Sequence, residues 1–163
     1  MESSPPISIR LAAMEDVPAV AQIVAAAYQD CQEKFKPNPD KTPEWMGWWN
    51  SLAHPQMEDH TAFVIKEMTY LICLDKGIIG TFRLEHHDGI TELDDFCILP
   101  AFQNKGFGSL ALGLMEKLEN VSCIELATPY FCKANRYLYE KAGYRQTGTR
   151  SNETVICYRK ALA

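Results

Sequence analysis

The stretch that decides the fold reads Gln103-Asn104-Lys105-Gly106-Phe107-Gly108, and it lies between an apolar run and an amphipathic segment. The apolar run ends at Pro100, which cannot continue a central strand. The amphipathic segment, residues 109–118, repeats leucines at helical spacing. Glycines at a helix start let backbone amides approach a ligand closely, and the positive end of the helix dipole favours an anion. Lys105 adds a cation and Gln103 a flexible amide, so the stretch predicts a pyrophosphate site.

Two glycine-rich phosphate motifs compete for these residues. The string Gly106-Phe107-Gly108-Ser109-Leu110-Ala111 fits the dinucleotide fingerprint G-x-G-x-x-[GA], but residues 100–105 separate it from the strand that should precede it directly. No G-x-x-x-x-G-K-[ST] string of a P-loop exists. The remaining pattern, [QR]-x-x-G-x-[GA] after a strand that ends in proline, resembles motif A of the GNAT superfamily of N-acetyltransferases. That resemblance implies that the loop wraps the pyrophosphate of acetyl-CoA. The residues it assigns to the coenzyme are Gln103, Asn104, Lys105, Gly106, Phe107, Gly108 and Ser109.

A second stretch, residues 135–144, resembles motif B of the same family, N-x-x-x-x-[FY]-x-[KR]-x-G-[FY]. The resemblance implies that Asn135 bonds the pantetheine arm and that Tyr139 lies near the coenzyme sulfur. Gly143 is also typical of a residue that ends a helix. The alternative for Tyr139 is an ordinary half-buried helix tyrosine.

The resemblance implies an α/β fold with a mixed, mostly antiparallel sheet flanked by helices, in the order β-α-α-β-β-β-α-β-α-β-β. Periodicity and turn residues predict these elements. The strands are expected at residues 7–11, 70–74, 78–85, 92–99, 123–127, 144–149 and 154–159, and the helices at 17–28 with Asp16 as N-cap, at 43–52, at 109–118 and at 134–142. Residues 58–68 are ambiguous, with helix favoured. We expect a single acetyltransferase domain over residues 1–163, with residues 1–6 as a flexible tail.

The strand before the glycine turn carries the remaining coenzyme contacts that the resemblance implies. Free amides of Phe96 and Ile98, with Cys97 between them, are expected to bond the pantetheine and the thioester carbonyl. Period-two alternation places Glu92, Asp94, Phe96 and Ile98 on one face of this strand.

Proton transfer requires a base for the attacking amine and an acid for the leaving thiolate. The resemblance implies Glu92 as the general base and Tyr139 as the general acid, and Asp94 lies one step nearer the thioester. Two carboxylates on one face raise the pKa of one of them. A solvated strand start is the alternative reading of both acidic residues.

The composition limits the partners. The formal charge of −5, the pI near 5.4 and the lack of a Lys/Arg cluster argue against nucleic acid, and no apolar run is long enough to span a membrane. No signal-peptide pattern opens the chain, and six scattered cysteines without C-x-x-C pairs favour free thiols in the cytoplasm over a disulfide or zinc framework. The His86-His87 pair is better explained by a turn than by a metal, and we expect no metal.

The expected function is acetyl-CoA-dependent N-acyl transfer to a primary amine of a small molecule or peptide, by direct attack in a ternary complex. Glu85, Asp88, Glu92, Asp94 and Asp95 favour a cationic amine, unless they only face solvent. The alternatives are a non-catalytic acyl-CoA-binding module and an NAD oxidoreductase. Trp45, Trp48 and Trp49 either cap the acceptor site or form a helix-packing face. Exposed strands near the C-terminus favour a homodimer.

Overall fold

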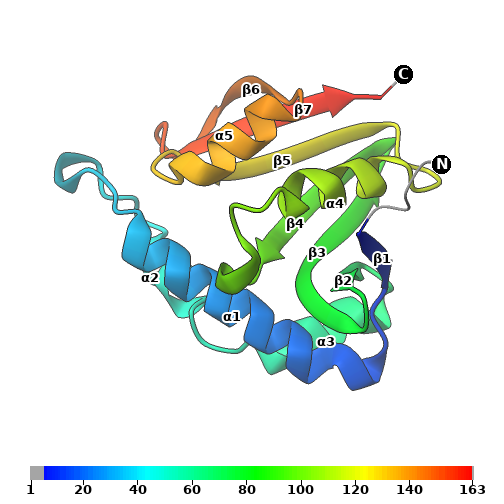
Figure 1. The fold of residues 1–163 in the computed structure, drawn as a ribbon. Coiled ribbons are helices and arrows are strands. Elements are labelled where there is room, and N and C mark those ends of the chain that lie inside the picture. The colour runs from blue at the N-terminus through cyan, green and yellow to red at the C-terminus, as the bar shows by residue number, and fades with distance from the viewer. Residues whose placement is uncertain (1–5, 163) are drawn as a thin grey trace.

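The structure, a computed structural model, describes residues 6–162, and these form one seven-stranded sheet with helices on both faces (Figure 1). The strand order is β1-β2-β3-β4-β5-β7-β6. The strands are β1 (Ile7–Leu11), β2 (Thr69–Leu74), β3 (Gly77–His87), β4 (Ile90–Ile98), β5 (Cys123–Pro129), β6 (Arg145–Arg150) and β7 (Val155–Ala161). Within residues 6–162 the β4–β5 pair is the parallel one, and the other neighbouring pairs are antiparallel.

Residues 6–162 form five α-helices: α1 (Val17–Lys34), α2 (Met46–Ser51), α3 (Met57–Ile65), α4 (Phe107–Glu116) and α5 (Lys133–Lys141). Short 3₁₀ turns lie at Met14–Asp16, Pro39–Lys41 and Pro100–Phe102. Side chains of α4 and α5 join the largest core cluster on one face, and α1 packs into a second cluster on the other. None of the helices in the described range is long and apolar enough to cross a membrane.

The predicted fold class and order of elements are confirmed, with one helix more before β2 than that order contains. The ambiguous segment 58–68 contains α3, and segment 43–52 contains the short α2. The tail expected over residues 1–6 lies, except for Pro6, outside the described residues.

The predicted N-cap position of Asp16 is confirmed, but its side chain does not cap the helix. Asp16 does precede α1, but no amide of the first turn of that helix is capped by its side chain. The carboxylate instead accepts hydrogen bonds from the Ala13 amide at 2.8 Å and from Arg10 at 2.9 Å. The Asp16 carboxylate is therefore occupied by the Ala13 amide and the Arg10 guanidinium, which precede it in the chain, and not by the amides of the helix.

A β-bulge interrupts β4. The β3–β4 register shifts between the pairs Thr81↔Cys97 and Arg83↔Asp94, and Asp95 adopts a positive φ of 48°. The predicted common face of Glu92, Asp94, Phe96 and Ile98 is therefore wrong. Asp94 contacts Arg83 on the α3 side of the sheet, whereas Phe96 and Ile98 pack into the cluster that contains α4.

The parallel strands β4 and β5 separate soon after they meet. They pair at Thr91↔Ile124 and Glu92↔Glu125, and no pairing of the two strands is found in the described chain beyond Glu92. Figure 1 shows the two strands diverging toward the end that carries the α4 turn. Backbone groups of residues 93–98 on the side of β4 that faces β5 are thus left without a partner strand.

Candidate active site

A cleft of about 980 Å³ opens where β4 and β5 diverge. It joins three regions that are distant in sequence: the turn before α4, the second half of β4 and the inner face of α5. Of the residues predicted to form the site, it is lined by Asp94, Phe96, Cys97, Ile98, Gln103, Asn104, Gly106, Gly108, Ser109, Asn135 and Tyr139. Three other predicted residues, Glu92, Lys105 and Phe107, do not line it.

The turn before α4 has the backbone geometry of an anion site. Gly106 is the N-cap of α4 with φ +84°, and Asn104 before it has φ +60°. No side chain caps this helix, so the amides of its first turn are available to a ligand. A β-carbon added to Gly106 would meet no atom within 4 Å, whereas one added to Gly108 would lie 3.5 Å from Leu138 of α5. The helix start therefore faces open space in which a pyrophosphate fits.

Two side chains of this turn act differently from the prediction. The Gln103 amide, expected to be free for the phosphate, donates a hydrogen bond to the Ile98 carbonyl at 2.9 Å and so ties the turn to the end of β4. Lys105 lies over the Phe102 ring, 5.9 Å from its centroid, and Phe107 packs into the core near that ring. The backbone, rather than the Gln103 or Lys105 side chain, is what the turn presents to the cleft.

The inner face of α5 brings Asn135 and Tyr139 to the cleft. Asn135 donates a long hydrogen bond of 3.4 Å to the Thr128 hydroxyl. Tyr139 is 6 % exposed, and its ring packs edge-on against Tyr144 with centroids 5.8 Å apart. Burial raises the pKa of the Tyr139 phenol well above its usual range, so the phenol holds its proton at neutral pH. The phenol therefore stays protonated and can donate a hydrogen bond into the cleft.

Among the carboxyl groups that line the cleft, Asp94 has the pKa that is raised most strongly toward neutral pH. Its pKa is raised to about 6, mainly by burial and in smaller part by the nearby Glu92 and Asp95 charges, while the Arg83 guanidinium partly offsets the rise. Arg83 Nη2 lies 3.5 Å from Asp94 Oδ2. A carboxyl with such a pKa is ionised at neutral pH and still basic enough to accept a proton.

Asp95 occupies the bulge and is held from two sides. The Tyr28 hydroxyl of α1 donates to Asp95 Oδ1 at 3.0 Å, and Arg83 Nη2 lies 3.9 Å from Asp95 Oδ2. Burial raises the pKa of Tyr28, so this phenol remains a donor. The bulge thus directs two successive carboxylates at one guanidinium, and Asp95 is the more fixed of the two.

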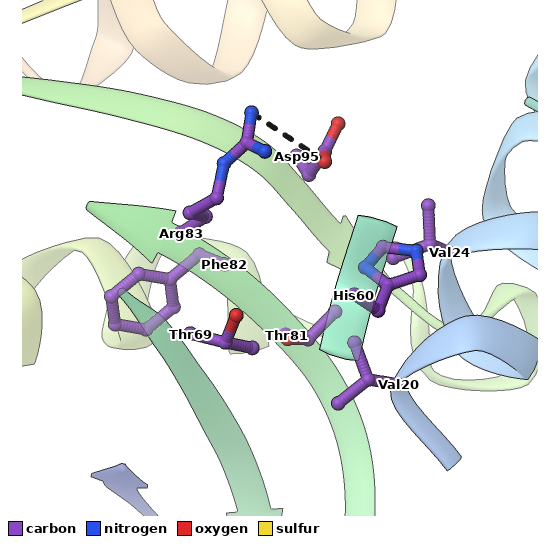
Figure 2. A pocket seen from close by; sticks show the side chains of 8 residues that line it. All are labelled: Val20, Val24, His60, Thr69, Thr81, Phe82, Arg83 and Asp95. Atoms are coloured by element: carbon purple, nitrogen blue, oxygen red, sulfur yellow. Dashed lines mark ion pairs between the residues drawn. The ribbon is translucent and has the colours of Figure 1, made fainter. Parts of the chain in front are cut away.

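A small cavity of about 10 Å³ adjoins the cleft beneath Arg83 (Figure 2). His60, Arg83, Asp95 and Val24 line both the cavity and the cleft. The Arg83 guanidinium is held by stacking on the Phe63 ring of α3, 3.8 Å from its centroid. Burial lowers the pKa of His60, which is therefore neutral at pH 7. The positive charge that faces the two carboxylates is that of Arg83.

Glu92 lies in the paired part of β4, opposite Glu85 of β3. Glu85, His87 and Glu92 each place one atom able to bind a metal ion within 4.8 Å of the others, on the β3–β4 hairpin. His87 Nε2 is 3.3 Å from the Glu85 carboxylate. Because side chains alternate along β3, His87 joins this acidic group and His86 does not. The group lies outside the cleft.

Aromatic side chains of residues 45–49 line another part of the cleft. Trp49 and Phe131 are buried at its base, with ring centroids 5.2 Å apart, and Trp45 stacks on Phe131. Trp48 is 64 % exposed and lines the cleft. Both readings of this tryptophan group apply, because Trp45, Trp48 and Trp49 all line the cleft while Trp49 is also buried in a packed cluster that Trp45 joins.

Sequence reasoning missed Arg83, His60 and Tyr28 as parts of the site. Arg83 carried a signal, because it is a lone cation inside the apolar strand of residues 78–84. His60 and Tyr28 carried none, since their positions are set by how α1 and α3 pack on the sheet.

Comparisons with known proteins agree with this geometry. A family model described as "Acetyltransferase (GNAT) domain" matches residues 60–146, more than half of the chain. No functionally curated protein sequence matches significantly. Among solved structures, a GNAT-family acetyltransferase from Streptococcus agalactiae superposes with a TM-score of 0.80 at 12% identity, covering 96% of each chain. The PaiA N-acetyltransferase of Thermoplasma acidophilum, in complex with coenzyme A, gives a TM-score of 0.76 at 15% identity, covering 96% of this chain and 99% of its own.

The Escherichia coli ribosomal-protein-S18-alanine N-acetyltransferase gives a TM-score of 0.62 at 14% identity, covering 96% of this chain and 94% of its own. At these identities the solved structures show a common fold, and the family model shows descent. The glycine turn, the diverging strands and the family match together establish that this chain is a member of the GNAT family of acetyltransferases.

Proposed function

We propose that this acetyltransferase transfers the acetyl group of acetyl-CoA directly to a primary amine while both substrates are bound. The observation that carries the proposal is the continuous cleft that joins the α4 turn, the unpaired side of β4 and the inner face of α5. Holding both reactants in line within one cleft supplies much of the rate enhancement for such a reaction.

The coenzyme occupies the half of the cleft near α4. The first-turn amides of Gly108 and Ser109 receive the pyrophosphate, and Asn135 meets the pantetheine arm. Unpaired amides in the segment Phe96–Cys97–Ile98 hold the thioester carbonyl and the oxyanion that forms on it. These roles match the positions of the residues around the cleft.

Asp94 is the base that we assign to the incoming amine, because it lines the cleft and its pKa is raised to about 6. Glu92 is outside the cleft and acts on the reaction through the pKa of Asp94. Tyr139 is the acid that returns a proton to the coenzyme sulfur. Its buried, protonated phenol belongs to α5 and lines the same cleft as Asp94.

The acceptor that fits the other half of the cleft is a cationic amine with an apolar body. Four carboxylates line the cleft, Asp30, Asp59, Asp94 and Asp95, and the exposed Trp48 indole stands beside them. A cation is attracted by the carboxylates and by the aromatic faces. Three residues of the predicted acidic group, Glu85, Asp88 and Glu92, lie outside the cleft and do not contribute to this choice.

The six cysteines are all free thiols, which supports a reducing compartment, and we place the enzyme in the cytoplasm.

The rival function is a module that binds acyl-CoA without chemistry. Incubation of the protein with acetyl-CoA and a panel of primary amines separates the two. The proposal expects acetylated amine and free coenzyme in equal amounts. Coenzyme binding with no product from any amine would favour the rival.

A further inference from the structure

Two cysteines far apart in the sequence meet at the wall of the cleft. The Sγ atoms of Cys31, near the end of α1, and Cys132, the residue before α5, are 3.5 Å apart. Both residues line the cleft. The remaining four cysteines form no thiol pair of this kind in residues 6–162.

The two thiols differ in access. Cys132 is 1 % exposed and packs with Trp49 and Phe131 in the aromatic base of the cleft, whereas Cys31 is half-buried at the edge of that cluster. A small molecule in the cleft therefore reaches Cys31 first. Cys132 is protected from solvent but lies next to any adduct on Cys31.

The two thiols also differ in acidity. When Cys31 is a thiolate, the Cys132 thiol donates a hydrogen bond to it, and this bond lowers the pKa of Cys31, with burial and the Asp30 charge opposing it and Lys34 assisting it. Asp30 and Lys34 pair with each other at 2.9 Å, so their effects on Cys31 largely cancel. The same hydrogen bond and burial raise the pKa of Cys132. Cys31 is the attacking thiolate, and Cys132 is the thiol that resolves the adduct.

We propose that Cys31 and Cys132 form a redox-modification site, which hydroperoxides convert to a disulfide that slows acetyl transfer. The effect on transfer rests on the proposed function, whereas the disulfide does not. The site is separate from the residues assigned to the coenzyme and to proton transfer.

The chemistry balances with one equivalent of hydrogen peroxide. The Cys31 thiolate attacks one peroxide oxygen, an S–O bond forms, the O–O bond breaks, and the departing hydroxide takes a proton to become water. The Cys132 sulfur then attacks the Cys31 sulfur and gives up its proton. The S–S bond forms, and the S–O bond breaks with loss of a second water. Two thiols lose two electrons, and the peroxide becomes two waters.

The disulfide would change the geometry of the cleft. Its sulfur atoms must close from 3.5 Å to about 2.05 Å, which draws the end of α1 toward the start of α5. One turn before Cys31, Tyr28 holds Asp95, and Asn135 and Tyr139 follow Cys132 along α5. A displacement of this order in the groups that orient two substrates lowers the rate by roughly tenfold or more.

The first experiment maps thiols and needs no turnover. The reduced protein is treated with one equivalent of hydrogen peroxide, quenched with an alkylating agent and digested for mass spectrometry. The proposal expects a Cys31–Cys132 cross-linked peptide, reversed by dithiothreitol, and alkylation of the other four cysteines. Cys73→Ser, a matched control outside the cleft, forms the same cross-link, and Cys31→Ser and Cys132→Ala do not. Sulfinic acid on Cys31 without a cross-link, or cross-links spread over other cysteine pairs, would overturn the proposal.

The second experiment measures the consequence in the cross-linked protein. Acetyl transfer to an amine should fall roughly tenfold or more and recover with dithiothreitol, while Cys31→Ser keeps its own rate after peroxide. An unchanged rate in fully cross-linked protein would overturn the regulatory part of the proposal. If no amine is acetylated, the proposed function fails instead, and calorimetric titration of coenzyme A into reduced and cross-linked protein decides, with equal affinities counting against regulation.

Discussion

Arg83 Nη2 lies 3.5 Å from Asp94 Oδ2, across the β3–β4 ladder and at the edge of the cleft. The pair sets the charge of the carboxyl that we assign as general base. Burial is the main cause that raises the pKa of Asp94 to about 6, and Arg83 keeps it from rising further. Because this carboxyl must be ionised to accept a proton, the rate should increase as pH rises through that pKa.

Replacing Arg83 by Met removes the charge that lowers the pKa of Asp94. The rising limb of the kcat/KM profile should therefore move to higher pH, by about one unit, while Arg83→Lys leaves it near its original position. Asp94→Asn should remove the limb and lower kcat/KM by roughly a hundredfold. The measurement is kcat/KM as a function of pH, from about two units below to about two units above the Asp94 pKa. A limb that stays unchanged in Asp94→Asn would show that Asp94 is not the base.

Tyr139→Phe removes the phenol proposed to protonate the coenzyme sulfur and keeps the ring that packs on Tyr144. We expect kcat to fall by roughly ten- to a thousandfold, with little change in the affinity for coenzyme A. Tyr70→Phe, on β2 and outside the cleft, is the matched control and should keep the wild-type rate. Equal kcat values for Tyr139→Phe and wild type would show that another group protonates the sulfur.

Gly108→Asp tests the coenzyme turn. The substitution places a negative charge at the start of α4, where the pyrophosphate is expected, and like charges in contact cost several kcal/mol. Calorimetry should show the affinity for coenzyme A reduced by roughly a hundredfold or more. Gly113→Asp adds the same charge to the same helix away from the cleft and should bind normally. Undiminished affinity in Gly108→Asp would contradict the site.

Acceptor charge can be tested with two aspartates, one inside and one outside the cleft. Asp59 lines the cleft and Asp88 does not. For a cationic amine, Asp59→Asn should lower kcat/KM by roughly two- to fivefold at low salt, a difference that shrinks as salt screens the charge. Asp88→Asn should have no effect, and a neutral amine of matched shape should respond to neither change. Equal responses of the two amines would mean that cleft charge does not select the acceptor.

Local sequence was sufficient to predict the turn before α4 and the helix itself. Gly106 supplies the positive φ that the turn requires, and the apolar period after it specifies α4, so the residues of the turn carry their own signal. The acceptor half depends on packing. The bulge at Asp95 changes which side chains share a face of β4, and strict alternation cannot reveal it. The Cys31–Cys132 contact joins residues 101 positions apart and has no local signal.

The central claim is that the acetyl group passes directly from the coenzyme to the amine, without a covalent acetyl-enzyme intermediate. The alternative has specific candidates, because Cys31, Cys97 and Cys132 all line the cleft. Burial raises the pKa of Cys97 far above its usual range, which keeps this thiol protonated and makes it a poor nucleophile beside the expected thioester.

Rapid-quench mixing of the reduced enzyme with acetyl-labelled acetyl-CoA, with and without a primary amine, tests this claim most directly. The account predicts that no label enters the protein and no burst of free coenzyme appears in the absence of amine. With amine present, label should reach the amine at the rate at which coenzyme is released. Label on a cysteine at a rate that matches turnover would contradict the account.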